Sequence, residues 1–157
     1  MTGASVASSY QDAMQAVFSS AIAGKAWFAT AAFVLAFVQV ITAARMWGRI
    51  QGVVRLELPA VRVIHRWSGR LALLFTLPVV FHCTTILGFQ STDARVLVHS
   101  VVGSFLYGVF AAKMVAIKKH DFPGWVIPVF GGSVFAGLVI LWATSSYWYF
   151  TEVRFGF

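Results

Sequence analysis

Four histidines are the residues of this sequence whose type and spacing could bind a metal ion or a metal-containing cofactor. They are His65, His82, His99 and His120, and they lie in or at the ends of two long apolar stretches. Imidazole nitrogens are common metal ligands. Ionisable side chains within a membrane are costly, and they usually have a function. The four histidines are therefore the candidate ligands of this chain.

The apolar stretches that carry these histidines predict membrane-spanning helices. The chain has 157 residues, of which 59% are hydrophobic and only 11% are charged, whereas a soluble domain has about 25% charged residues. A spanning helix needs about 20 apolar residues. The sequence predicts an all-α, four-helix transmembrane bundle in a single integral membrane domain over residues 1–157. Its helices are expected at about 24–47, 63–89, 95–119 and 123–150.

The distribution of basic residues predicts the orientation of the bundle. The connection between the first two helices is rich in arginine, and the third helix ends with Lys118 and Lys119. Basic loops stay in the cytoplasm, so both termini, including an outer surface segment at residues 1–23, are expected outside a plasma (cytoplasmic) membrane. Residues 1–23 do not begin with the basic residues that are typical of a signal peptide, which argues against one. Anionic lipid headgroups account for the basic residues, and no nucleic-acid-binding motif is present.

The positions of the histidines predict two pairs of ligands at equal depth. The second and third helices form a hairpin whose turn is expected at residues 90–95, and the pairs His82/His99 and His65/His120 are both centred on that turn. Two imidazoles that face each other across a helix pair provide the axial ligands of six-coordinate haem iron. The chain has one cysteine and no C-x-x-C-H motif, so a haem would be bound non-covalently. We expect two haem b groups, with a single haem as the alternative.

Small and aromatic residues near these histidines could form the walls of such a site. Gly69 and Gly103 each follow a histidine by four residues, and residues with this spacing share a helix face. Each glycine would let a flat macrocycle approach the backbone. Phe81 and Phe105 are the expected aromatic walls.

Cations near the inner pair could bind haem propionates through charge-assisted hydrogen bonds. Lys113 lies within the third helix, and its side chain is expected to extend to the lipid headgroups. The alternatives are that Lys113 contacts a propionate or a polar group of the bundle. The expected propionate partners are Arg62, Arg66, Arg70, Lys118 and Lys119.

The helical period does not place His65 and His82 on one face of an ideal helix, because their spacing leaves them about 100° apart. Pro78 lies four residues before His82. A proline inside a helix removes a hydrogen bond and bends the axis, so we expect Pro78 to change the direction of His82.

The segment HRWSG, residues 65–69, resembles the H-R-x-x-G helix starts of the cytochrome b561 and ferric reductase-like groups. The paired histidines on two helices are similar to those of small di-haem membrane cytochromes b. This resemblance implies two b haems in a helical bundle that moves electrons across or into the membrane. It also implies that His65, His82, His99 and His120 are the axial ligands.

The predicted function is electron transfer by a membrane-embedded, b-type di-haem protein. No catalytic carboxylate pair is evident, which favours a relay or a subunit of a larger redox complex over a complete enzyme. A quinone or another redox protein is the expected partner, and association into homo- or hetero-oligomers is left open. The alternatives are a non-haem metal-binding or proton-handling protein, and a structural membrane subunit whose histidines face lipid or cap helices.

Overall fold

The computed structural model describes residues 3–53, 55–119 and 121–154, and it confirms the all-α prediction. Four of its helical segments are long and apolar enough to cross a membrane: Ala21–Met46, Leu58–Leu87, Ala94–Lys118 and Val126–Val153. Each exceeds the roughly 20 residues that a bilayer requires. The predicted spans agree with these segments to within a few residues, except that the second begins five residues before its predicted start.

The spans are built from α-helices that continue into π-helical turns at two points. After a short α1 (Gly3–Gln15), the chain forms α2 (Ala21–Met46) and then α3 (Leu58–Phe81), which continues as η1 (His82–Leu87). Next come α4 (Ala94–Lys118) and α5 (Val126–Trp142), followed by η2 (Ala143–Tyr147) and η3 (Tyr149–Arg154). The side chains of Ser20 and Asp93 cap α2 and α4 by accepting backbone N–H bonds, which satisfies donors that a helix start leaves free.

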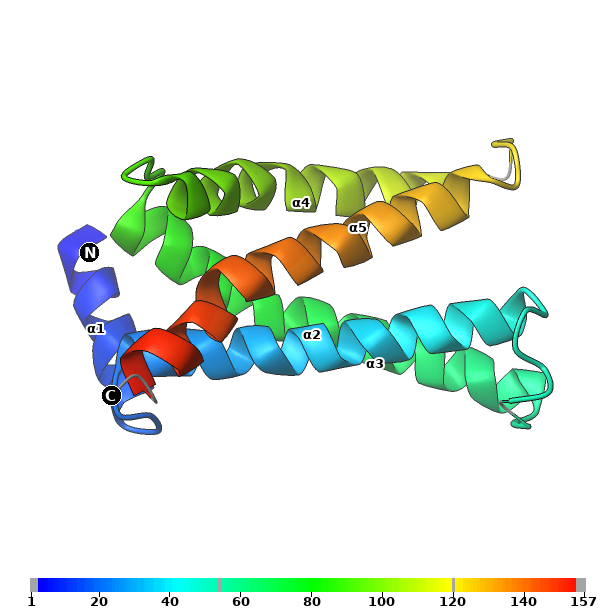
Figure 1. Ribbon diagram of the computed structural model, residues 1–157, viewed down its shortest axis with the longest axis horizontal. Coiled ribbons are helices and arrows are strands. Elements are labelled where there is room, and N and C mark those ends of the chain that lie inside the picture. Colours follow the sequence, from blue (N-terminus) through cyan, green and yellow to red (C-terminus); the bar gives the residue numbers. More distant parts are fainter. Residues whose placement is uncertain (1–2, 54, 120, 155–157) are drawn as a thin grey trace.

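The helices pack as two hairpins, α2 with α3 and α4 with α5, and α5 also contacts α2 (Figure 1). Helix α2 buries only small side chains, among them Ala23, Ala26, Ala32 and Ala36. Small residues let helices approach closely in a membrane, where hydrophobicity itself does not drive helix association. Close packing of α2 therefore sets the centre of the bundle.

Helices α3 and α4 are consecutive in the chain, yet they make few contacts among the described residues. The hairpin of α3 and α4 that the sequence predicted is therefore not packed along its length. The space between α3 and α4 is lined by the other two spans as well. Pro78 lies inside α3, and the α-helical pattern gives way to η1 four residues later. The predicted effect of Pro78 on the direction of His82 stays a prediction.

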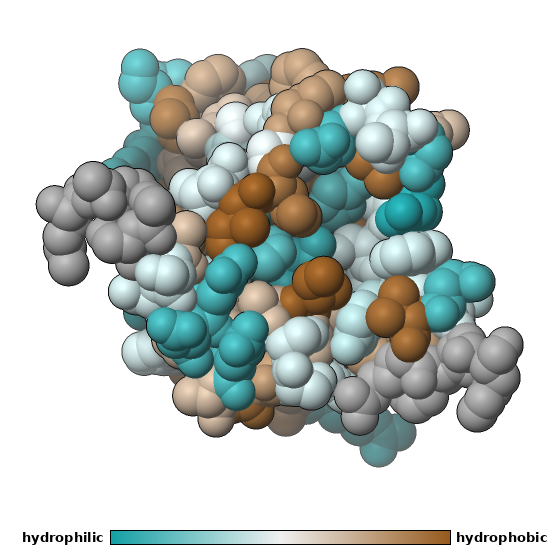
Figure 2. Space-filling view, turned by 90° about the vertical axis from the view of Figure 1, so that its left-hand side faces the viewer, coloured by the Kyte–Doolittle hydropathy of each residue, from teal (hydrophilic) through white to brown (hydrophobic). Residues whose placement is uncertain are grey.

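Helix α1 packs against one end of the bundle, where it contacts α2 and the α3–η1 junction (Figure 1). The Tyr10 hydroxyl donates to the Pro78 carbonyl at 3.1 Å, and Met14 is buried. Burial raises the pKa of Tyr10. Figure 2 shows this end of the molecule, where hydrophilic residues lie among hydrophobic ones. We call it the α1 end, and the end with the α2–α3 and α4–α5 connections the loop end.

Candidate functional site

Two cavities lie inside the bundle, and all four spans contribute to each. The first cavity, toward the α1 end, has a volume of about 410 Å³ and contains His99 in its wall. The second cavity, toward the loop end, has a volume of about 360 Å³ and contains His65 in its wall. Cofactor sites are concave, mostly apolar and a few hundred Å³ or larger. Each cavity thus presents one imidazole in a space of suitable size.

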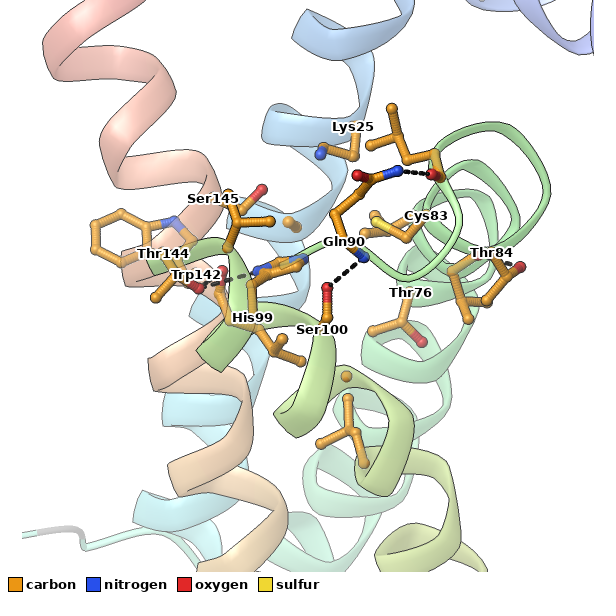
Figure 3. Close-up of a pocket in the computed structure, with 18 of the residues that line it drawn as sticks. Lys25, Thr76, Cys83, Thr84, Gln90, His99, Ser100, Trp142, Thr144 and Ser145 are labelled. Atoms are coloured by element: carbon orange, nitrogen blue, oxygen red, sulfur yellow. Dashed lines mark hydrogen bonds between the residues drawn. The ribbon is translucent and has the colours of Figure 1, made fainter. Parts of the chain in front are cut away.

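The imidazole of His99 is held by a threonine of the neighbouring hairpin helix. Its Nδ1 lies 3.0 Å from Oγ1 of Thr144, and that hydroxyl donates to the Ile140 carbonyl at 2.7 Å. Because the hydroxyl proton is used in that bond, Thr144 accepts from Nδ1–H, and Nε2 keeps its lone pair. Figure 3 shows the second ring nitrogen directed away from Thr144, toward Cys83 and Gln90. The first cavity therefore contains an imidazole suited to bind a metal through Nε2.

The imidazole of His65 is held in the same way. Its Nδ1 lies 2.8 Å from Oγ1 of Thr42, which donates to the Val38 carbonyl at 2.6 Å. As at His99, the threonine hydroxyl proton is already used, so Thr42 accepts from Nδ1–H of His65. The lone pair of Nε2 is therefore left to bind a metal. Gln39 supports the arrangement, since its amide nitrogen bonds to the His65 carbonyl and to Oγ of Ser68. Bonds from α2 thus fix the position of His65 on α3.

The two cavities share part of their walls. Four residues line both of them: Thr76, Leu106, Tyr107 and Leu138. The Tyr107 hydroxyl of α4 donates to Oγ1 of Thr76 on α3 at 2.8 Å. This hydrogen bond crosses the space between two helices that otherwise make few contacts. Groups bound in the two cavities would thus be separated by little more than one layer of side chains.

The cavities occur in a chain that matches one protein family over its whole length. The model of DUF6529 matches residues 1–157. The chain belongs to DUF6529. That family is described as one of unknown function, so the resemblance to cytochromes b561 and ferric reductase-like proteins stays a prediction. No curated protein and no solved structure matches the chain.

In this DUF6529 chain, the structure does not bring all four predicted ligands into the cavities. His82 lines neither cavity; it is 3% exposed, and its ring lies 5.8 Å from that of Tyr10. Both of its ring nitrogens are buried without a hydrogen-bond partner. His120 lies outside the described residues. The pairing of His82 with His99, and of His120 with His65, therefore stays a prediction.

The expected wall residues have different surroundings. Gly103 lines the first cavity and Gly69 the second. A Cβ atom on Gly69 would lie 3.1 Å from Oε1 of Gln39, so this glycine also allows α2 and α3 to approach. Phe81 lines neither cavity and packs against Tyr10, with the ring planes tilted by 51°, and Phe105 is 68% exposed on the outer surface. The two phenylalanines are therefore not cavity walls in this structure.

The expected propionate partners also lie elsewhere. All five are exposed and line neither cavity: Arg62, Arg66, Arg70, Lys118 and Lys119. Charge-assisted hydrogen bonds need direct contact, which a residue outside the cavity walls does not make in this structure, and the assignment of these five residues to propionates stays a prediction. The cations that do line cavities are Lys25 and Arg95 in the first, and Arg49 and Lys113 in the second.

Sequence reasoning missed the threonines that orient the two histidines. Thr42 and Thr144 are polar residues inside spans, which is the one signal that could have singled them out. Several other threonines lie in spans as well, for example Thr84 and Thr85, whose hydroxyls bond carbonyls of their own helix. Only the tertiary contacts distinguish the threonines that bond a histidine from those that bond only their own helix. In the described residues, no group of three or more His, Cys, Asp or Glu side chains could hold a metal ion.

Proposed function

We propose that this protein is a membrane-embedded electron-transfer protein that binds two b-type haems, one in each cavity. The observation that carries the proposal is the repeated arrangement of one imidazole per cavity, with Nδ1 bonded to a threonine and Nε2 left as a ligand. A haem-ligating histidine needs this tautomer, and a bond at Nδ1 fixes the ring orientation. Protein sites for a non-haem metal such as zinc usually have three or four protein ligands, and the described residues contain no group of three or more His, Cys, Asp or Glu side chains that could hold a metal ion.

The residues present fit haem in a further respect. A buried imidazole without a hydrogen bond is unusual, because an unsatisfied buried polar group costs about 1–3 kcal/mol. His82 is in that state, and its neighbour Cys83 lines the first cavity. We propose His82 as the second ligand in the first cavity and His120 as the second ligand in the other. Neither ring nitrogen of His82 would have to give up a hydrogen bond.

When bound, haem iron supplies reversible one-electron chemistry. The chain's own residues do the rest. His65 and His99 hold the metal, Thr42 and Thr144 fix the direction of the rings, and the apolar walls exclude water. The cavities share the wall that includes Tyr107, so an electron that passes between the two sites would cross this wall.

The biological setting that we propose follows from the charge distribution. With the basic loop end in the cytoplasm, the termini and the first cavity would face outward from the plasma membrane. The protein would relay electrons through the bilayer, as part of a larger redox complex, to or from a quinone or another redox protein.

A pyridine haemochrome assay combined with protein quantification tests the proposal. We expect b-type haem at two per chain, and a sharp alpha band when the purified protein is reduced. Folded protein without haem, prepared from haem-replete cells, would contradict the proposal.

A smaller effect is expected from Thr144→Val. The valine keeps the shape of the side chain but removes the acceptor for Nδ1–H of His99, and loss of such a partner typically weakens metal binding by about 10- to 100-fold. We expect the affinity of the first cavity for haem to fall by at least about tenfold, measured by Soret titration. Thr85→Val is the matched control, because its hydroxyl bonds only its own helix. Equal affinities in the two variants would refute a role for Thr144.

A further inference from the structure

Each cavity contains two cations and no carboxylate. Lys25 and Arg95 line the first, Arg49 and Lys113 line the second, and no aspartate or glutamate occurs among the described residues that line either. Both cavities are otherwise largely apolar, and in such surroundings a charge is weakly screened. The electrostatics therefore favour a ligand that carries negative charge.

Lys113 is the most informative of these cations. It lies five residues before the end of a spanning helix, and its Cε and Nζ atoms are both 4.0 Å from the Cβ position of Gly131 on α5. The side chain thus reaches the adjacent helix α5 at the wall of the second cavity. A cation inside a membrane is expensive unless it has a partner, and the ion pairs of the described residues do not include Lys113.

The cations of the first cavity lie at its α1 end. Lys25 is in the second turn of α2 and Arg95 in the first turn of α4. The Arg95 guanidinium is fixed in place, since it donates to the Thr144 carbonyl at 2.7 Å and lies 4.2 Å from the ring centroid of Trp148. It also lies 3.9 Å from the exposed carboxylate of Asp93, outside the cavity wall. Figure 3 shows the Lys25 side chain on the same side of the cavity as Gln90 and Ser145. Both cations are placed where an anionic edge of a ligand could leave the apolar interior.

We propose that Lys25 with Arg95, and Lys113 with Arg49, bind the carboxylates of the cavity ligands, which for haem b are its two propionates. This inference rests on the proposed function, and it gives each porphyrin a defined orientation. Lys25 and Arg95 would hold the carboxylates of the first ligand at the α1 end of its cavity, away from the wall with Tyr107. The exposed cations that line neither cavity take no part: Arg62, Arg66, Arg70, Lys118 and Lys119.

Haem and its dimethyl ester distinguish carboxylate binding from binding of the porphyrin itself. The full-length apoprotein in detergent is titrated with ferric protoporphyrin IX and with the dimethyl ester, which lacks both carboxylates, and the Soret band reports binding. A His99→Ala background isolates the second cavity, and a His65→Ala background isolates the first. For each variant we compare the ratio of its affinity for haem to its affinity for the dimethyl ester. The two porphyrins partition differently into detergent, but this difference is the same for every variant and cancels when the ratios are compared.

In the His99→Ala background, we expect Lys113→Gln to reduce the preference for the free acid by about fivefold or more, as loss of a charge-assisted hydrogen bond would. Lys118→Gln, an exposed lysine on the same helix, is the matched control and should leave the ratio unchanged. In the His65→Ala background, Lys25→Gln should reduce the ratio similarly.

The outcomes separate this inference from the proposed function. Binding of both porphyrins with a ratio that neither lysine substitution changes would overturn the carboxylate assignment and leave haem binding intact. Binding of neither porphyrin to the unsubstituted protein would overturn both.

Discussion

Replacing His99 by alanine is expected to lower the haem content from two per chain to about one, and His65→Ala should do the same at the other cavity. In the proposed function each histidine is the Nε2 ligand of its cavity, and no other imidazole of the described residues lines either cavity. The pyridine haemochrome assay on purified variants measures the loss. The double variant should be colourless.

A control must show that the histidine variants still fold. Circular dichroism and size-exclusion chromatography of the double variant provide that control, since the histidines contribute little to helix packing compared with the small residues of α2. His99→Gly should regain its haem when imidazole is added, because the free ring can occupy the vacated space. Unchanged haem content in both single variants would remove the basis of the proposed function.

The second large effect is expected for Gly137→Leu, which should destabilise the bundle by about 1–3 kcal/mol through overpacking. Gly137 is buried in α5, and a Cβ atom there would lie 3.0 Å from Cδ1 of Leu106 and 3.8 Å from Cγ1 of Val102. A leucine would push α4 away from α5 and displace Leu106 from the wall that both cavities share. Thermal unfolding in detergent measures the change.

Gly108→Leu is the matched control for this prediction. Gly108 lies on α4, exposed, with nothing within 4 Å of its Cβ position, and it lines neither cavity. We expect a change in unfolding temperature close to zero. Similar losses in the two variants would indicate that α5 does not depend on a close approach at Gly137.

The sequence by itself determined the number and approximate limits of the spans. Length and hydropathy are local properties, and a bilayer imposes the same requirement on every helix that crosses it. The sequence also singled out His65 and His99, because ionisable groups are rare in such stretches.

Only the tertiary structure decided which residues face the cavities. In a membrane, apolar side chains cover every side of a helix, so the sequence pattern does not show how each helix is rotated about its axis. That rotation is set by close contacts of small residues, such as Ala32 of α2 and Gly137 of α5. It turns Phe105 and the cations of the loop end outward, and it brings Lys25, Lys113 and the two threonines inward. The partners of the histidines therefore depended on packing between distant segments, which spacing along the chain does not encode.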